Sequence, residues 1–162
     1  MENSAKKLPK IRKATLKDAE ELRNLYFEFM LEISRIDPFY RQDMEHWKSE
    51  DSLHDIVKDI IKKNRQFFLL EQDGRVIGFV DALVKKRDEA YKIWKTGHIE
   101  AIYVKPEFRK KGYSKMLVDR AMEWFQMKGM GHFTVGTYAL DAKARKYWER
   151  LGFKEYFVLY HK

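Results

Sequence analysis

The stretch that most constrains the fold of this chain is residues 102–118, where a strand pattern changes into a helix pattern across a short basic turn. Up to Tyr103, apolar side chains alternate with a period of two, which predicts a β-strand. From Met116 to Trp124 they recur at spacings of three and four, which predicts a helix. The turn between them contains Arg109 and Gly112. Because the first N–H groups of a helix lack internal partners and carry the positive end of its dipole, this turn can cradle a phosphate group.

An ordinary lysine-rich surface loop is the alternative interpretation of this turn, because one glycine and a few charges are common in such loops. The longer pattern around the turn favours the phosphate site. It resembles the coenzyme A pyrophosphate-binding motif of the GNAT superfamily of N-acetyltransferases, and it consists of Val104-x-Pro106-x-x-Arg109-x-x-Gly112-x-Ser114. Ser114 stands where that family usually has Gly or Ala, and its small side chain still lets the backbone come close to a ligand.

A second pattern resembles another signature of the same family, its penultimate helix and the turn that follows. It consists of Asp141-x-x-Ala144-x-x-Tyr147-Trp148-Glu149-Arg150-Leu151-Gly152-Phe153. The two motifs stand at the family's usual separation, which makes the resemblance specific over residues 97–153. The resemblance implies an α+β fold with a mixed, mostly antiparallel central sheet flanked by helices. It also implies that acetyl-CoA or coenzyme A is the cofactor.

The resemblance assigns the cofactor-binding residues as well. The backbone of Ile102, Tyr103 and Val104 would bind the pantetheine arm in the manner of an added strand. The turn would surround the pyrophosphate, and the second motif would contribute its first residue. The remaining members of the set are therefore Arg109, Lys110, Lys111, Gly112, Tyr113, Ser114 and Asp141.

Periodicity and turn signals predict the other elements. Strands are expected at residues 10–14, 66–70, 75–84, 96–104, 132–138 and 153–160, and helices at residues 16–35, 52–64, 113–128 and 141–151. Asp73-Gly74 predicts a hairpin, and Thr15 with Asp18 predicts a helix cap. Residues 1–8 are expected to be a flexible leader, and residues 37–49 either a substrate-facing loop or a packed connector, with the connector favoured. The whole chain, residues 1–162, is expected to form one domain.

The composition indicates a folded chain and restricts its possible chemistry. The chain has 44% hydrophobic residues and no cysteine, which excludes disulfides, thiolate metal sites and a cysteine nucleophile. Because no thiol can carry the acyl group, the amine is expected to attack acetyl-CoA directly in a ternary complex. The histidines show no ligand spacing, so no metal site is predicted. No apolar run is long enough for a membrane span, and a cytoplasmic location is expected.

The net charge of +8 allows another interpretation, a nucleic-acid-binding module that uses residues 85–87 and 109–111. Residues 101–120, however, have six basic and two acidic residues, a balance of +4, whereas residues 31–60 have four basic and eight acidic residues, a balance of −4. An enzyme for an anionic cofactor and a cationic amine would show this division, so nucleic acid is the less favoured partner. The acceptor is expected to be a polyamine, an amino sugar or a protein amine, and a homodimer is compatible with the sequence.

Two residues are predicted to act on protons during the transfer. Glu100 precedes Ile102 by one pleat and should share its strand face, so it is the candidate base, directly or through water. A simple ion pair with a neighbouring lysine is the alternative. The family usually has a tyrosine as general acid where this chain has Trp148, whose indole cannot exchange a proton usefully. Tyr147 is the candidate acid if the helix is rotated, and Tyr138 or unassisted departure of the thiolate remains open.

Overall fold

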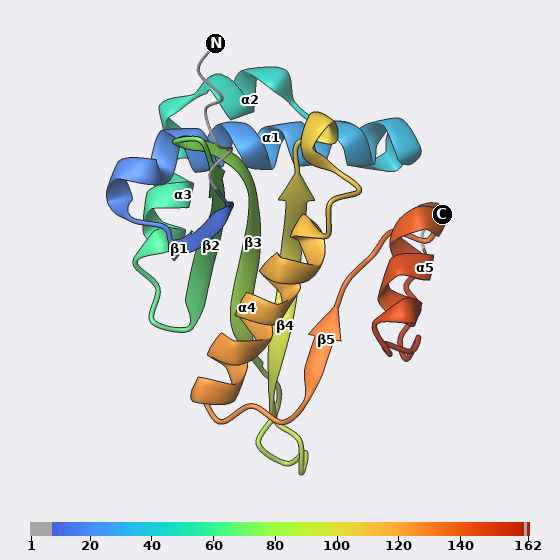
Figure 1. The fold of residues 1–162 in the computed structure, drawn as a ribbon. Coiled ribbons are helices and arrows are strands. Elements are labelled where there is room, and N and C mark those ends of the chain that lie inside the picture. Colours follow the sequence, from blue (N-terminus) through green and yellow to red (C-terminus); the bar gives the residue numbers. More distant parts are fainter. Residues whose placement is uncertain (1–7, 161) are drawn as a thin grey trace.

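The computed structural model describes residues 8–160 and 162, so the predicted leader lies outside the described residues except for Leu8. A five-stranded sheet organises the fold, in the order β1 (Lys10–Lys13), β2 (Arg65–Gln72), β3 (Arg75–Lys86), β4 (Lys95–Val104) and β5 (Phe133–Val135). Neighbouring strands are antiparallel except β4 and β5, which are parallel (Figure 1). The predicted class, a mixed and mostly antiparallel sheet flanked by helices, is confirmed.

Helices cover both faces of this sheet. The helices α1 (Ala19–Ile36) and α3 (Glu50–Ile60) pack on one face, and α4 (Tyr113–Met127) packs on the other. The short α2 (Met44–Lys48) joins α1 to α3, and α5 (Ala142–Arg150) lies beside β5 (Figure 1). Among the residues that the structure describes, no helix is both long and apolar enough to cross a membrane.

Consecutive apolar residues in β2 pack against both layers of helices. Phe67 and Leu69 are buried on the side of α1 and α3, while Phe68 and Leu70 are buried on the side of α4. A sheet with one solvated face would show alternation, so this continuous apolar run reflects a sheet that is covered on both sides. On the α4 side, Gly97 of β4 lets the helix approach closely, because a Cβ there would lie 2.5 Å from the ring of Phe125.

Most predicted elements are present, with shifted ends. The hairpin predicted at Asp73-Gly74 joins β2 to β3, and the capping box of Thr15 and Asp18 is formed. That box caps a 3-10 turn, Leu16–Asp18, so the first helix begins three residues later than predicted.

The region of α2 and α3 differs more from the prediction. The helix predicted from residue 52 begins at Glu50, because the hydroxyl of Ser49 caps it by accepting a hydrogen bond from the N–H of Ser52. The predicted connector, residues 37–49, contains α2 and a 3-10 turn, Pro38–Tyr40. Elements as short as these have too few residues to show a helical period.

The strands near the carboxyl end are shorter than predicted. The strand predicted at residues 132–138 is limited to Phe133–Val135, and the strand predicted at residues 153–160 is absent from the described part of the chain. After α5 the chain turns back, because the N–H of Phe153 donates a hydrogen bond to the carbonyl oxygen of Trp148 and Arg145 donates to Glu155. These contacts hold the segment beside α5 rather than in the sheet (Figure 1).

Candidate active site

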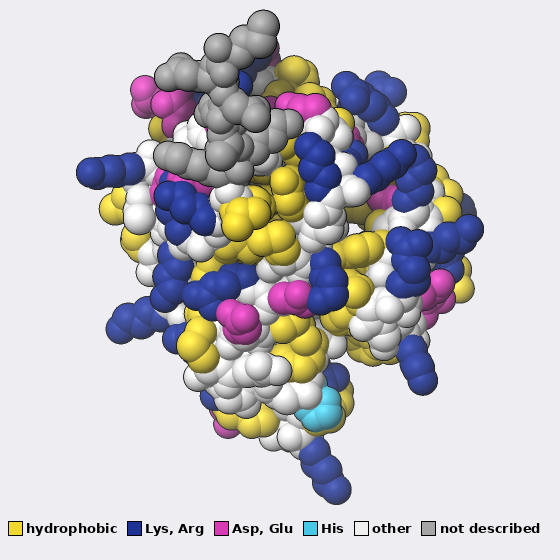
Figure 2. Space-filling model, viewed as in Figure 1, with side chains coloured by type: hydrophobic (Ala, Val, Ile, Leu, Met, Phe, Trp, Pro, Cys, Tyr) yellow, Lys and Arg dark blue, Asp and Glu magenta, His cyan; other side chains and the backbone are white. Residues whose placement is uncertain are grey.

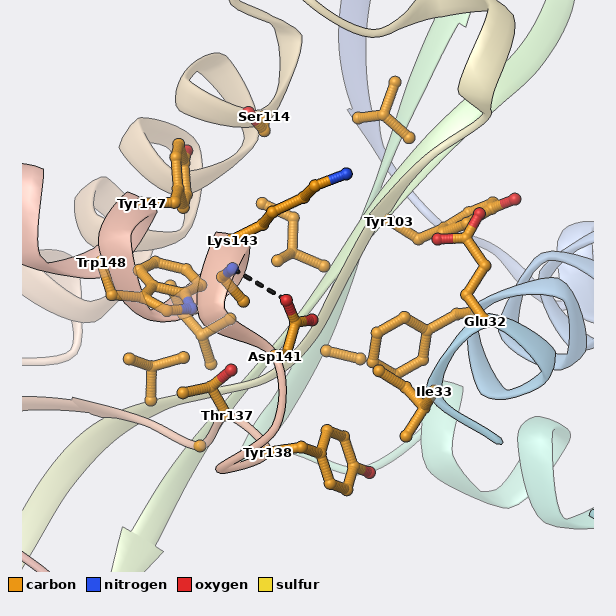
Figure 3. Close-up of a pocket in the computed structure, with 18 of the residues that line it drawn as sticks. Glu32, Ile33, Tyr103, Ser114, Thr137, Tyr138, Asp141, Lys143, Tyr147 and Trp148 are labelled. Atoms are coloured by element: carbon orange, nitrogen blue, oxygen red, sulfur yellow. Dashed lines mark hydrogen bonds between the residues drawn. The ribbon is translucent and has the colours of Figure 1, made fainter. Parts of the chain in front are cut away.

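A cavity of about 510 Å³ opens where the parallel strands β4 and β5 separate. The two strands pair at three positions, of which the last joins Ile99 to Val135. Beyond this pair, β4 lines one side of the cavity and the residues after β5 line the other, with α1, α5 and the start of α4 around them (Figure 3). Residues 100–104 of β4 therefore have no strand partner on the β5 side among the described residues. Backbone groups along such an edge can pair with an extended ligand.

The predicted phosphate turn borders this cavity. Gly112 is the N-cap of α4 with a φ of 80°, a backbone conformation that favours glycine, and no side chain caps the helix. The N–H groups of the first helical turn are thus available to an anion. A Cβ on Gly112 would meet no described atom within 4 Å, so the space around this backbone is open. The turn therefore fits the pyrophosphate of coenzyme A.

The structure brings nine of the ten predicted cofactor-binding residues to the cavity, and their role stays a prediction. Lys111 is the exception, because its ammonium group lies over the ring of Phe108, 5.4 Å from the centroid. Asp141 lines the cavity, but its carboxylate has a local role. Its Oδ1 accepts a hydrogen bond from the N–H of Ala144, which caps α5 (Figure 3).

Arg109 is turned toward α1. Its Nε donates a hydrogen bond to the carbonyl oxygen of Val104 at 2.7 Å, and its Nη2 lies 2.7 Å from Oε1 of Glu32. Its guanidinium group also lies over the ring of Tyr103, 5.4 Å from the centroid. Sequence reasoning missed Glu32, which is 77 residues away from Arg109 and belongs to no motif. Only the packing of α1 against the sheet brings the two residues together.

Glu100 lies in a β-bulge. Asp81 of β3 pairs with Ala101 and the next residue, Ala82, pairs with Ile99, which leaves Glu100 as the extra residue on β4. The bulge shifts the alternation of side chains. Ile102 consequently packs on the α4 side, whereas Glu100 contacts Lys85 and His98, which by alternation face the side of α1. The prediction that Glu100 and Ile102 share a strand face is therefore wrong, although both line the cavity.

The surroundings of Glu100 favour its ionised form. Its Oε2 lies 3.4 Å from Nε2 of His98 and 3.1 Å from Nζ of Lys85, so the predicted alternative, an ion pair with a neighbouring lysine, is present. The hydrogen bond from His98, with that from Lys85 and against the opposing effect of burial, lowers the pKa of Glu100 to about 2. Such a carboxylate can orient a cation or a water molecule, but it is a weak acceptor for a proton at neutral pH.

Tyr147 and Trp148 both line the cavity from α5. Trp148 is buried, and its ring packs against Tyr147 and Phe153. The hydroxyl of Tyr147 is buried too, and it has no hydrogen-bond partner among the described residues. Burial raises the pKa of Tyr147, and the nearby hydroxyl of Ser114 acts in the opposite direction. Figure 3 shows Tyr147 and Ser114 on the same side of the cavity, so this hydroxyl is placed to donate to a bound ligand.

Tyr138 stands near the opposite border of the cavity (Figure 3). Its ring packs edge-on against Tyr40, with 4.3 Å between the centroids. Burial, together with the neighbouring Tyr40 and Glu100, raises the pKa of Tyr138. Because Tyr40 belongs to residues 37–49, this segment contacts a residue of the cavity wall. The contact favours the substrate-facing interpretation of that segment over the connector.

Known proteins resemble this chain in sequence and in fold. A sequence model described as the acetyltransferase (GNAT) family matches residues 19–153. The chain belongs to this family. The match confirms the resemblance that residues 97–153 carry and extends it over most of the chain.

Two curated relatives of this GNAT chain carry informative names. An uncharacterised N-acetyltransferase of Methanocaldococcus jannaschii is 26% identical over 153 residues, which cover 90% of this chain and 60% of that protein. An aminoglycoside N(6')-acetyltransferase type 1 of Salmonella typhimurium is 29% identical over 93 residues, which cover 54% of this chain and 61% of that protein. The chain thus spans about 60% of the length of the curated relatives it matches.

A solved structure confirms the GNAT fold. The aminoglycoside N-acetyltransferase AAC(6')-Iy, in complex with CoA, superposes with a TM-score of 0.75 at 22% identity. The match covers 100% of this chain and 99% of that chain. The shared architecture therefore extends beyond the two motifs to the whole sheet and its helices.

Proposed function

We propose that this protein moves an acetyl group from acetyl-CoA to a primary amine, by direct attack of the amine within a ternary complex. The observation that carries the proposal is that one cavity joins the uncapped helix start at Gly112 to the carboxylates of Glu32 and Glu100. When bound, acetyl-CoA supplies a thioester that is already activated. The protein therefore has to hold both substrates and to handle protons, and it needs no nucleophile of its own.

The cofactor would be held by charge at one end and by backbone groups along its arm. The N–H groups that follow Gly112, together with the cations Arg109 and Lys110, would bind the pyrophosphate. The edge of β4 at residues 100–104, which has no strand partner among the described residues on the β5 side, would bind the pantetheine arm. An arm that follows this edge runs from the turn toward Glu100.

Two side chains would act during the transfer. Glu100 would hold the cationic amine, and the amine would release its proton to bulk solvent before it attacks, because a carboxyl with a pKa of about 2 is a poor base at neutral pH. Tyr147 would donate a proton to the departing thiolate. Its hydroxyl is buried and has no hydrogen-bond partner by distance and angle among the described residues. Like any tyrosine it is protonated at neutral pH, and burial raises its pKa further. A free thiol has a pKa of about 8.5, so this proton assists departure without being indispensable.

An amino sugar is the acceptor that we propose among the three classes. The names of two relatives, both aminoglycoside acetyltransferases, support this choice. The cavity supports it as well, because the carboxylates of Glu32 and Glu100 and the rings of Phe29 and Tyr138 line it together. Carboxylates bind ammonium groups and aromatic faces attract cations. We place the reaction in the cytoplasm, with which a chain that has no cysteine is compatible.

The alternative function, a nucleic-acid-binding module, has less support. Lys85 pairs with Glu100 and Arg109 pairs with Glu32, so a cation in each predicted basic patch already has a carboxylate partner. On the face shown in Figure 2, Lys and Arg side chains are scattered among acidic and apolar ones. A surface that follows a phosphate backbone would concentrate its cations in a patch or stripe.

Calorimetric titration of the whole chain with coenzyme A, acetyl-CoA and a duplex oligonucleotide tests the proposal. We expect both forms of the cofactor to bind with a Kd in the micromolar range, about −8 kcal/mol. The oligonucleotide should bind weakly, and its binding should disappear as salt rises. No response to coenzyme A, together with tight oligonucleotide binding at physiological salt, would overturn the proposal in favour of the module.

A further inference from the structure

One end of the sheet carries most of the net charge of this chain. Three segments meet there: residues 61–64 before β2, residues 85–95 around the loop between β3 and β4, and residues 127–132 around the end of α4. Together they contain eight basic and two acidic residues, a balance of +6, whereas the whole chain has a formal net charge of +8. The rest of the chain is therefore nearly balanced. We call these three segments the basic end.

Hydrogen bonds and packing hold the three segments together. The N–H of Val84 donates to the carbonyl oxygen of Asn64 at 2.7 Å, and the N–H of Gly97 donates to the carbonyl oxygen of His132 at 2.9 Å. Gly97 also lies against the ring of Phe125, near the end of α4. In Figure 1 the loop between β3 and β4 projects beyond the sheet at this end, and α4 starts at the opposite end. The basic end is thus remote from the phosphate turn.

Most cations at the basic end lack a carboxylate partner. Lys62 pairs with Asp59, and Lys85 pairs with Glu100. Side chains of one charge that are gathered on one surface create a potential that attracts a partner of the opposite charge. The other six cations form no ion pair among the described residues, and all of them except Lys95 are exposed: Lys63, Lys86, Arg87, Lys92, Lys95 and Lys128.

Large apolar side chains stand among these cations. The exposed fraction is 64% for Ile61, 57% for Tyr91, 36% for Ile93 and 68% for Met127. Each of the three segments therefore presents at least one apolar side chain at the same end of the molecule. Such a mixture suits the surface of an anionic bilayer, where apolar side chains enter between the acyl chains and cations contact the head groups.

A nucleic acid is also anionic, but these side chains favour a bilayer. Single-stranded nucleic acids stack their bases on open aromatic faces. The two rings of the loop are instead engaged by cations of the same chain. The guanidinium group of Arg87 lies 4.9 Å from the ring centroid of Tyr91, and Nζ of Lys95 lies 3.9 Å from that of Trp94. The aliphatic side chains at this end cannot stack on bases, whereas they can be buried among acyl chains.

We propose that the basic end docks this protein on the surface of a bilayer that contains anionic lipids. Its aliphatic side chains enter the interface and its lysines contact the head groups. The binding is peripheral and needs no membrane-spanning helix. The proposal does not rest on the acetyltransferase activity. Because the phosphate turn lies at the other end of α4, docking leaves that turn facing away from the lipid (Figure 1).

Co-sedimentation of the whole chain with lipid vesicles is the test. We expect binding to vesicles of equal parts phosphatidylserine and phosphatidylcholine, and little binding to phosphatidylcholine alone. Each cation near an anionic surface strengthens binding about fivefold, so the charge-reversed variant Lys86→Glu/Lys92→Glu should lower the partition coefficient at least about 25-fold. The control Lys146→Glu/Lys154→Glu makes the same change in net charge at exposed positions in and after α5, and it should bind nearly as well as the wild type.

A second variant separates insertion from attraction by charge alone. Ile61→Ser/Met127→Ser keeps every charge but removes two exposed apolar side chains, so the partition coefficient should fall at least about tenfold. Its control, Leu140→Ser/Leu159→Ser, changes two exposed apolar residues elsewhere and should not affect binding. Circular dichroism establishes that each variant is folded.

Several results would overturn the proposal. One is a wild-type chain that does not bind the anionic vesicles. Another is a loss of binding in either control that equals the loss in its matched variant, because the basic end would then have no special role. Unchanged binding of the serine variant at the basic end would exclude insertion. Tight binding of an oligonucleotide at physiological salt, abolished in the charge-reversed variant, would make the basic end a nucleic-acid surface instead.

Discussion

Arg109 and Glu32 form an ion pair between the phosphate turn and α1, with Nη2 of the arginine 2.7 Å from Oε1 and 3.0 Å from Oε2. The same arginine donates from Nε to the carbonyl oxygen of Val104, on the strand edge where the pantetheine arm is expected. A residue predicted to bind the cofactor is thus tied to a carboxylate of α1 that lines the same cavity. Binding of pyrophosphate by Arg109 would release Glu32 to a cationic acceptor, which links the two substrates.

Replacing Glu32 tests this link. Glu32→Gln removes the competing carboxylate, so coenzyme A should bind up to about fivefold more tightly, since an exposed ion pair is worth about 1 kcal/mol or less. The KM for the amine should rise, because the acceptor loses a carboxylate. Titration and steady-state kinetics measure the two effects. Glu45→Gln, which removes an exposed ion pair in α2, should change neither. Weaker binding of coenzyme A by Glu32→Gln would contradict the link.

A substitution at Gly112 tests whether the turn binds phosphate. Gly112→Val places a branched side chain at a φ of 80°, which should cost about 1–2 kcal/mol of stability even though no described atom lies in its way. The new side chain would also stand where a phosphate has to approach the backbone. We expect the affinity for coenzyme A to fall at least about tenfold, or 1.4 kcal/mol.

The matched control for this change is Gly131→Val. Gly131 also has open space around it, but its φ lies outside the left-handed region and it is not part of the cavity. Its variant should bind coenzyme A like the wild type. A folded Gly112→Val variant with wild-type affinity would remove the turn from the cofactor site.

Substitutions at Tyr147 and Trp148 test which side chain assists the departure of the thiolate. Because acid catalysis is typically worth about 10²–10⁴-fold, Tyr147→Phe should lower kcat by that factor while the affinity for coenzyme A changes little. Trp148→Tyr should hold or raise kcat only if position 148 faces the sulfur. Tyr138→Phe serves as the comparison for the other candidate acid. A loss of less than about threefold in Tyr147→Phe would show that its hydroxyl is not the acid.

The pH dependence of kcat is a second test of Tyr147 as the acid. Burial raises the pKa of its hydroxyl above the ordinary value of 10.0, so the acid stays protonated to higher pH than a free tyrosine. We expect kcat to persist beyond that pH and to fall only where Tyr147 ionises. The Tyr147→Phe variant should lack this basic limb. A basic limb that survives unchanged in the variant would assign it to another group.

The lowered pKa of Glu100 predicts that the stability of the fold depends on pH. Its pKa is lowered from 4.5 to about 2, so the unfolded chain binds the proton more readily than the folded chain. The stabilising contribution of Glu100 is therefore complete above its unfolded pKa and is lost as pH falls through the folded value. Thermal unfolding measures the free energy of unfolding of wild type and of Glu100→Gln. The difference between these two free energies should shrink as pH is lowered through this range. Glu89→Gln, in the exposed loop between β3 and β4, should show no such trend. A constant difference for Glu100→Gln would contradict the ion-pair geometry.

Features that depend on neighbours in the sequence could be predicted. The turn at Gly112 and the hairpin at Asp73-Gly74 depend on backbone conformations that few residue types adopt, so they leave local signals. The apolar run of β2 likewise predicts a strand covered on both faces. These elements position the cavity, and the family resemblance supplied the predicted cofactor-binding residues, nine of which line it.

Features that depend on tertiary packing could not be predicted. A period of two cannot reveal the bulge at Glu100, because the extra residue is defined only by the pairing of β4 with β3. The contact of Glu32 with Arg109 requires α1 to lie against the turn. The strand predicted at residues 153–160 is absent from the described part of the chain, because contacts at the end of α5 direct the segment away from the sheet.

Release of free coenzyme A in the presence of acetyl-CoA and an amino sugar with several primary amines tests the central claim most directly. A thiol reagent reports the release without background from the protein, because the chain has no cysteine. The account predicts release that depends on the acceptor, with a matching gain of one acetyl group on an amine of the sugar by mass spectrometry. Release at the same rate without any amine, or no release with amino sugars, polyamines and peptide amines alike despite bound acetyl-CoA, would contradict it.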